Sequence, residues 1–305
     1  MSKIAFVCAG QGAQAPGMGR ELYDASPAAR AVFDAAEALR PGVTALCFDG
    51  PSEALNQTIN TQPCLFVVDL AAARALREAG VEPQGAAGFS LGELVADTVA
   101  GMMDEAAAFR LVCARAEAMQ ACNEKHPGSM FAVLRLSDEQ VESIAAAVGS
   151  AYPVNYNCPG QVVVACQTSV GPDLQQAVTA AGGKAIKLPV GGAFHSPLMD
   201  EAVVPLRAAL AATTFAPMTI PVYANATAAV YDDPAELLAR QVNHPVLWSQ
   251  TIKTMIADGF DTFVEVGPGK TLSGFIRKTD PSVTVTNVAD LDSLNQTLEV
   301  LAHGR

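Results

Sequence analysis

The chain has 305 residues, of which 50% are hydrophobic and 16% are charged. At roughly 150 residues per domain, this length predicts about two folding units, or one large unit with an insertion. The composition excludes a disordered, collagenous or low-complexity chain. With 19 Lys and Arg against 31 Asp and Glu, the formal net charge is −12. Such a field repels polyanions, so we expect no nucleic acid partner.

The N-terminus and the cysteines favour a cytoplasmic protein. The first residues lack the long apolar segment and cleavage site of a signal peptide, and no window is apolar enough to span a membrane. The seven cysteines are scattered and never spaced as CxxC, which indicates neither a disulfide framework nor a zinc site. We therefore expect no metal and no membrane partner.

Strands and helices alternate along the first part of the chain. Residues 3–8 form an apolar run closed by glycines, which predicts a buried strand, and Ser26 followed by proline predicts a helix start. Helical patterns at 66–79 and 104–120 flank a short small-residue strand at 85–89. This alternation predicts an α/β fold.

The order of predicted strands and helices changes over residues 126–192. The predicted order there is βαββαβ, the ferredoxin-like pattern, and Ser137 with Gln140 forms a capping box at its first helix. Alternating strands and helices resume beyond it. We therefore predict a core of residues 1–125 and 193–305, with an inserted small subdomain at 126–192.

The strongest local motif is GxSxG at residues 88–92, between a predicted strand and a predicted helix. A nucleophile elbow needs glycines on both sides of the serine because the turn is so sharp, and it exposes the hydroxyl at a helix N-terminus. Ser90 is therefore a candidate nucleophile. An ordinary serine in a tight turn is the alternative.

A serine nucleophile needs a base, and the chain has only four histidines. His126 lies in a predicted interdomain loop, His244 at a helix end and His303 near the C-terminus. His195 lies where the chain leaves the small subdomain and re-enters the core, so it can face a cleft between them. This makes His195 the candidate base, with a surface-loop histidine as the alternative.

Arg115 lies at the edge of the apolar stripe of the helix predicted at 104–120. An inward arginine must find an anion, and its planar guanidinium suits a carboxylate. That carboxylate can belong to a ligand or to a structural ion pair in the core, and the helical phase alone leaves both interpretations open.

Two glycine-rich segments resemble nucleotide-binding motifs but lack their partners. Residues 10–15 match GxGxxA, yet the acid in range, Asp34, falls in a helical pattern rather than at a strand end. The segment 267–271 ends like a P-loop but has Val264 where the first glycine belongs. We expect the glycines at 10–12 to let main-chain N–H groups approach the reacting centre.

Eight motifs follow one another in order along nearly the whole chain. They are GQGAQ (10–14), TQP (61–63), GFSLGE (88–93), Arg115 with Met119-Gln120, NYNCPGQVVVA (155–165), AFHSPLM (193–199), RQVNHPVLW (240–248) and VEVGPGKTL (264–272). Together they closely resemble the malonyl-CoA:acyl carrier protein transacylases, the acyltransferases of fatty acid and polyketide synthesis. The family fold, an α/β-hydrolase-like core with a parallel sheet and an inserted ferredoxin-like subdomain, agrees with the pattern described above.

The resemblance implies a malonyltransferase that works by ping-pong acyl transfer in fatty acid biosynthesis. Ser90 would attack malonyl-CoA, His195 would take and return the proton, and the malonyl group would pass to the phosphopantetheine thiol of acyl carrier protein. The main-chain amides at Gln11 and Leu91 would form the oxyanion hole. No bound cofactor is implied, because coenzyme A and the phosphopantetheine arm take part as substrates.

The resemblance also implies which residues select the substrate. Arg115 would clamp the malonyl carboxylate, because an acetyl group would leave the buried guanidinium unpaired. Gln241 is grouped with it at the substrate site, and its main-chain carbonyl would orient His195. Phe89 stands where the family usually has histidine, at a position that varies with the acyl unit in related polyketide enzymes. Phe194, in Ala-Phe-His, matches the form associated with malonyl.

Three interpretations compete with this one or refine it. A serine acyl hydrolase shares the nucleophile, base and oxyanion hole, and differs in the exclusion of water. A nicotinamide-binding protein would use residues 10–15, and a loader for a polyketide assembly line would share every residue named. Lys184 and Lys187, beside the strand leading to His195, are candidates for docking an acidic carrier protein, although ordinary solvated lysines fit equally well.

Overall fold

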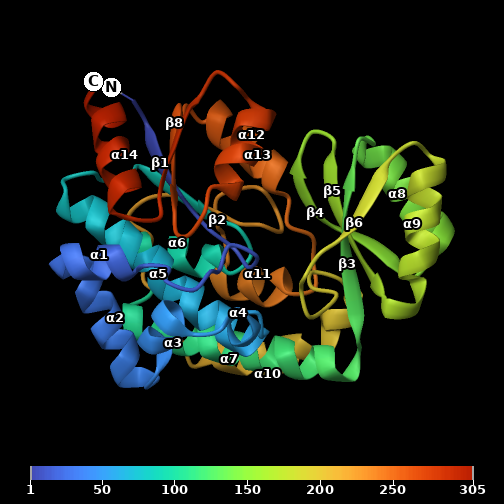
Figure 1. Ribbon diagram of the computed structural model, residues 1–305, viewed down its shortest axis with the longest axis horizontal. Coiled ribbons are helices and arrows are strands. Elements are labelled where there is room, and N and C mark those ends of the chain that lie inside the picture. The colour runs from blue at the N-terminus through green and yellow to red at the C-terminus, as the bar shows by residue number, and fades with distance from the viewer. Residues whose placement is uncertain (1, 304–305) are drawn as a thin grey trace.

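A five-stranded parallel sheet forms the centre of the larger part of the computed structural model, which describes residues 2–303 (Figure 1). The strand order is β7-β2-β1-β8-β9, and every neighbouring pair is parallel. The strands are β1 (Ile4–Cys8), β2 (Gly85–Gly88), β7 (Val222–Tyr223), β8 (Thr262–Val266) and β9 (Thr284–Val288).

Helices cover both faces of this sheet, and the side chains of β1 alternate between them. Phe6 packs into the larger hydrophobic cluster with α5 and α6, whereas Val7 packs into a second cluster with α12 and α13. The helices of the core are α1 (Arg20–Ala25), α2 (Pro27–Leu39), α3 (Val43–Asp49), α4 (Ser52–Leu55), α5 (Thr58–Glu78), α6 (Gly92–Val99), α7 (Glu105–Lys125), α10 (Asp200–Ala211), α11 (Pro234–Gln241), α12 (Trp248–Ala257), α13 (Thr271–Thr279) and α14 (Leu291–His303).

A separate four-stranded antiparallel sheet forms the smaller part, drawn in green and yellow in Figure 1. Its elements are β3 (Gly128–Leu134), α8 (Asp138–Val148), β4 (Ala151–Cys158), β5 (Gln161–Gln167), α9 (Gly171–Ala180) and β6 (Lys184–Lys187). The strand order β4-β5-β3-β6 and the βαββαβ connectivity are those of a ferredoxin-like unit. The predicted fold class is confirmed, while the boundaries 126 and 192 stay predictions.

Main-chain hydrogen bonds join the small sheet to the core. The N–H of Val246, just before α12, donates to the carbonyl of Val154 in β4 at 2.8 Å, and the N–H of Tyr156 donates back to Val246 at 3.0 Å. Strand β4 also packs against α12 and α13. One edge of the small sheet is thereby fixed to the core, and β6 forms its other edge.

Several predicted elements differ in length from those observed. Helix α5 begins at Thr58 rather than at 66, with Pro63 inside it, and the carbonyl of Ile59, which loses its helical donor at Pro63, accepts from Arg40 Nη1 at 2.8 Å instead. Helix α7 continues to Lys125 rather than ending at 120. It ends two residues before Pro127, because His126, the residue that precedes the proline, avoids the helical conformation.

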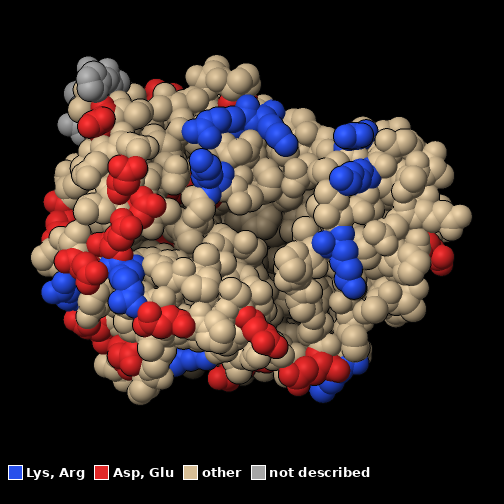
Figure 2. Space-filling model, in the orientation of Figure 1, with Lys and Arg blue, Asp and Glu red and all other residues tan. Residues whose placement is uncertain are grey.

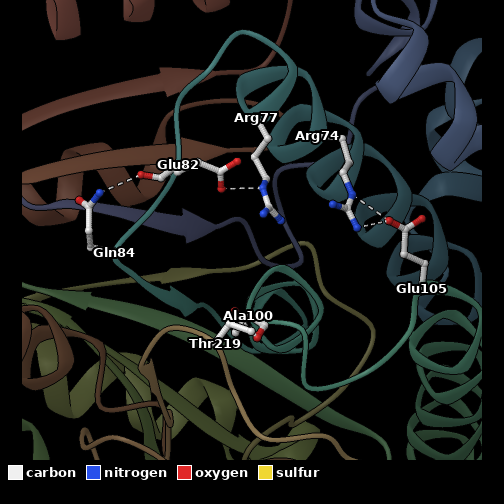
Figure 3. A network of polar contacts seen from close by, with 7 residues as sticks. All are labelled: Arg74, Arg77, Glu82, Gln84, Ala100, Glu105 and Thr219. Carbon is white, nitrogen blue, oxygen red and sulfur yellow. Dashed lines mark hydrogen bonds and ion pairs between the residues drawn. The ribbon is translucent and has the colours of Figure 1, made fainter.

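Ion pairs tie the end of α5 to its neighbours (Figure 3). Arg77 Nε lies 2.8 Å from a carboxylate oxygen of Glu82 in the loop before β2, and Arg74 Nη2 lies 2.5 Å from Glu105 at the start of α7. All four side chains are at least a third exposed, so each pair contributes at most about 1 kcal/mol. These ion pairs link α5 to the loop before β2 and to α7, and they add little to the stability of the fold.

The loops that follow β1 and β2 meet at the carboxyl end of the parallel strands. The two strands pair in register from Ala5 with Gly85 to Cys8 with Gly88, so both chains leave the sheet together. A Cβ on Gly10 would lie 2.5 Å from the carbonyl oxygen of Phe89, and one on Gly92 would lie 2.2 Å from that of Cys8. Only glycine permits this approach of the two loops.

Within residues 2–303, no helix has the length and apolar character needed to cross a membrane.

We predict opposite effects for two helical glycines. Gly92→Ala should lower the free energy of unfolding by about 1–3 kcal/mol or more, because main-chain atoms of the β1 loop must move. Gly274→Ala, in α13 with nothing within 4 Å of the new methyl group, should raise it by up to about 1 kcal/mol. Urea unfolding measures both, and a stabilising Gly92→Ala would refute the close packing.

Candidate active site

Ser90 occupies a sharp turn between β2 and α6. Its φ of 54° lies in the left-handed region, which is uncommon for a residue with a side chain. A Cβ on Gly88 would lie 1.9 Å from the main chain of Gly92, so the residue before this turn must be glycine. The turn has the geometry of a nucleophile elbow, as the GxSxG spacing predicts.

His195 lies against the hydroxyl of Ser90. Its Nε2 is 2.8 Å from Ser90 Oγ, and its Nδ1 is 2.7 Å from the main-chain oxygen of Gln241. A carbonyl only accepts, so in this arrangement Nδ1 carries the proton and Nε2 can accept from the serine hydroxyl. Burial, with the positive charge of Arg115 adding to it, lowers the pKa of His195 to about 4. The imidazole is therefore neutral at pH 7 and free to take a proton.

Arg115 is buried beside these two groups, at 2% exposure. Its Nη1 donates to Gln62 Oε1 at 2.6 Å, and its Nη2 donates to Ser90 Oγ at 3.1 Å and Gln241 Oε1 at 2.6 Å. Its Nε has no partner among the described residues. Burial lowers the pKa of Arg115 to about 10, so it still carries its charge at neutral pH.

The acceptors of Arg115 are all neutral. None of the ion pairs found within residues 2–303 includes Arg115, so the structure provides no carboxylate in direct contact with its guanidinium. Of the two interpretations left open by the helical phase, the structural ion pair therefore does not hold. A buried cation held only by amide and hydroxyl oxygens is suited to an incoming anion.

Residues of this site that were not predicted from the sequence include Gln62, Glu93 and Asn225. Glu93 is 1% exposed, and its Oε2 accepts from Gln241 Nε2 at 2.6 Å. Burial raises the pKa of Glu93 to about 7, opposed by hydrogen bonds and by the charge of Arg115. Asn225 Oδ1 accepts from the N–H of Ser90 at 2.7 Å. Glu93 could have been found as the last residue of GFSLGE, whereas no local signal marks Asn225.

Gln11 and Leu91 lie on the two loops that meet at the carboxyl end of the parallel strands. Leu91 directly follows Ser90 and precedes α6. Gln11 follows Gly10, which packs on the carbonyl of Phe89, and its side-chain amide reaches Thr58 Oγ1 at 3.5 Å. The main-chain N–H groups of both residues thus belong to segments that flank the nucleophile. Their oxyanion role stays a prediction.

A cavity of about 450 Å³ lies between the core and the small sheet, and its lining includes Gln11 and Phe89, the residue before Ser90. Figure 2 shows a hollow between the two parts of the molecule. Apolar side chains such as Phe89, Phe275 and Val163 line it together with amide side chains. Two of these amides, Asn155 and Asn157, have buried Oδ1 atoms without a hydrogen-bond partner in the described part of the chain. Two amide side chains with unused hydrogen-bonding capacity therefore lie in the cavity wall.

The remaining predicted residues differ in their burial and in whether they line this cavity. Phe89 lines it and packs edge-on against Trp248, with ring centroids 5.6 Å apart. Phe194 is buried next to His195 and is absent from the cavity lining. Lys184 and Lys187 are exposed on β6, which continues into the cavity wall at Leu188.

Among residues 2–303, no cluster of three or more His, Cys, Asp or Glu side chains could hold a metal.

The two segments that resemble nucleotide-binding motifs lack the surroundings of a nucleotide site. Asp34 lies exposed within α2, far from a strand end. At the second motif, the Glu265 carboxylate accepts from the N–H groups of Leu272 and Ser273 at 3.0 and 2.7 Å. A protein carboxylate thus already occupies the helix terminus where a phosphate would sit.

The fold and this site define an α/β protein with a buried Ser–His pair beside a buried arginine that has no directly paired carboxylate within residues 2–303. A family model described as the acyl transferase domain matches residues 5–296, and the chain belongs to this family. The malonyl CoA-acyl carrier protein transacylase of Bacillus subtilis (strain 168) is 36% identical over 311 residues, which cover 99% of this chain and 98% of that protein.

Two solved structures extend the likeness. The malonyl CoA-acyl carrier protein transacylase of Clostridium perfringens has 38% identity and a TM-score of 0.95, with 99% of this chain and 98% of that chain covered. A malonyl-transacylase solved in complex with its type II PKS acyl-carrier protein has 33% identity and a TM-score of 0.94, with 98% of this chain and all of that chain covered.

We predict that the imidazole of His195 stays neutral at pH 5.5, where a histidine of ordinary pKa is about 90% protonated. Nitrogen-15 NMR of the ring, assigned with a His195→Ala protein, measures its charge and tautomer directly. Arg115→Ala should raise the pKa of His195, because a nearby positive charge is removed. A midpoint near 6.5 in the unmodified protein would contradict the buried environment.

Proposed function

We propose that this protein transfers a malonyl group from coenzyme A to the phosphopantetheine thiol of acyl carrier protein, through an ester on Ser90. The observation that carries the proposal is Arg115, a buried cation that donates to Ser90 Oγ at 3.1 Å and has no carboxylate partner among residues 2–303. An acyl group with a distal carboxylate, placed on Ser90, supplies the missing anion. The names of the relatives support malonyl as the acyl group that is transferred.

In the first half-reaction Ser90 Oγ bonds to the thioester carbonyl carbon and its proton passes to His195 Nε2. Collapse of the tetrahedral intermediate breaks the carbon–sulfur bond, and the departing sulfur takes the proton from His195. The second half-reaction repeats these steps with the phosphopantetheine thiol as nucleophile and Ser90 as leaving group. The same base serves both halves, because each ends with a neutral imidazole.

The oxyanion of each intermediate needs donors that are already in place. We assign this task to the main-chain N–H groups of Gln11 and Leu91, on the loops that flank Ser90. The contact between Gly10 and Phe89 supports it, since it fixes one loop against the other. Gln241 contributes by holding Nδ1 of His195 with its main-chain oxygen and Arg115 with its side chain.

The cavity lined by Phe89, the residue before Ser90, suits a pantetheine arm because apolar and amide side chains share its wall. This arm carries two amide groups on a largely apolar chain, and it is common to coenzyme A and the carrier protein. The amide side chains of Asn155 and Asn157 belong to the cavity lining and can hydrogen-bond with its amide groups. The aromatic faces of Phe89 and Phe275 can cover its methylene groups. No cofactor is needed in this scheme.

Basic side chains lie on both sides of the hollow in Figure 2, whereas acidic side chains gather at the left and along the bottom of the same face. We assign Lys184 and Lys187, exposed on β6, to docking of an acidic carrier protein, because β6 leads directly to the cavity wall. Local complementarity of this kind steers association even when the net charge of the whole molecule is negative.

The pathway depends on the identity of the carrier protein. We propose fatty acid biosynthesis in the cytoplasm, a reducing compartment that suits seven unpaired cysteines. The likeness to a malonyl-transacylase in complex with a type II PKS acyl-carrier protein makes polyketide synthesis the second candidate. Both use the same chemistry at Ser90.

Intact-protein mass spectrometry after brief mixing with malonyl-CoA tests the proposal. We expect one malonyl adduct on the wild-type protein and none on Ser90→Ala, because the ester oxygen is then absent. Addition of a carrier protein that bears phosphopantetheine should discharge the adduct within the same interval. Ser249→Ala, a substitution at a buried serine in α12 outside the site, serves as the matched control and should label normally.

Two results would contradict the proposal. An adduct that decays in buffer as fast as with carrier protein would indicate a serine acyl hydrolase. Labelling that persists in Ser90→Ala would place the nucleophile elsewhere.

A further inference from the structure

The main chain of Ser90 is held on both sides by side-chain amides. Its N–H donates to Asn225 Oδ1 at 2.7 Å, and its carbonyl oxygen accepts from Gln241 Nε2 at 2.7 Å. Asn225 also donates from Nδ2 to the carbonyl of Gly88 at 2.6 Å, so it bridges the residue before the turn and the nucleophile itself. These bonds hold Ser90 at a φ of 54°, which a residue with a side chain does not readily adopt on its own.

Both amide residues are held in turn by the carboxylate of Glu93. Oε1 accepts from the main-chain N–H of Asn225 at 3.2 Å and from the hydroxyl of Tyr231, while Oε2 accepts from Gln241 Nε2 at 2.6 Å. The N–H of Glu93 donates to the carbonyl of Ser90 at 3.2 Å. One buried carboxylate thus joins every group that holds the main chain of the nucleophile.

The same carboxylate decides which end of the Gln241 amide faces Arg115. Because Nε2 donates to Glu93 and to the Ser90 carbonyl, Oε1 must face the guanidinium, where it accepts from Arg115 Nη2 at 2.6 Å. A flipped amide would place its N–H₂ against the guanidinium donors. Glu93 therefore acts on both the nucleophile and the arginine without contacting the hydroxyl of Ser90.

We infer that Glu93 is a positioning residue for acyl transfer, which holds Ser90 in its reactive geometry through Asn225 and Gln241. This inference rests on the proposed function. Every acyl group needs the same orientation of Ser90 Oγ, so loss of Glu93 slows acylation by acetyl as well as malonyl thioesters. Loss of the carboxylate-binding Arg115 affects malonyl selectively, and this difference separates the two roles.

Glu93→Gln tests the inference because it keeps the size of the side chain but turns one acceptor into a donor. We expect the maximal single-turnover rate of acylation to fall about 10- to 100-fold with both malonyl-CoA and acetyl-CoA, at an unchanged half-saturating concentration. Thr98→Val is the control: Thr98 lies on the same helix, is buried, and its hydroxyl donates to the main-chain oxygen of Leu94 rather than to Ser90, Asn225 or Gln241. It should react at close to the wild-type rate.

A double-mutant cycle shows whether Glu93 acts through Gln241. In a Gln241→Met background, Glu93→Gln should cost much less than it does in the wild type, because the shared contact is already lost. A merely structural role predicts a lower melting temperature, an unchanged single-turnover rate of the folded protein and additive effects. Those results, or a loss confined to malonyl-CoA, would overturn the inference.

If Glu93→Gln does not fold, Asn225→Ala tests the other arm of the same network. It must slow both thioesters equally, and a normal rate would overturn the inference. A wild-type protein that takes up no acyl group would overturn the proposed function itself. Normal wild-type acylation with an unaffected Glu93→Gln protein would overturn only the role of Glu93.

Discussion

The buried guanidinium of Arg115 is the constraint on which the rest of the site depends. Moving a cation out of water costs several kcal/mol even after relaxation, and within residues 2–303 the protein offsets this with three neutral acceptors, Gln62, Gln241 and the hydroxyl of Ser90. The arrangement keeps the charge next to the nucleophile and leaves it incompletely compensated. A substrate carboxylate completes it, whereas an acyl group without one does not.

The fold brings these groups together from distant parts of the sequence. A parallel sheet delivers the loops after β1 and β2 to its carboxyl end, and glycines at 10, 88 and 92 let their main chains touch. Helix α7 carries Arg115 to this end, and α11 ends at Gln241 with its main-chain oxygen on His195. The small sheet is joined to the core through β4 and forms the opposite wall of the cavity. The nucleophile thus directly follows Phe89, a residue of the cavity lining.

Residues whose roles are local could be predicted from the sequence. The GxSxG turn, the Ser26 and Ser137 helix caps and the inward phase of Arg115 each follow from spacing along a single element. The βαββαβ order likewise predicts the small sheet, because its strands are consecutive in the chain. Contacts between distant segments could not be predicted in this way. Asn225 lies 135 residues from Ser90, and nothing in its own segment indicates that it holds the nucleophile.

The most direct test of this account compares acylation by malonyl-CoA and acetyl-CoA in Arg115→Ala and in Arg110→Ala, an exposed arginine on the same helix. The account predicts that Arg115→Ala lowers the ratio of malonyl to acetyl single-turnover rates by at least about tenfold, the loss of one charged hydrogen-bonding partner. Arg110→Ala should leave the ratio at its wild-type value. An unchanged ratio in folded Arg115→Ala would contradict the claim that this guanidinium receives the carboxylate of the acyl group.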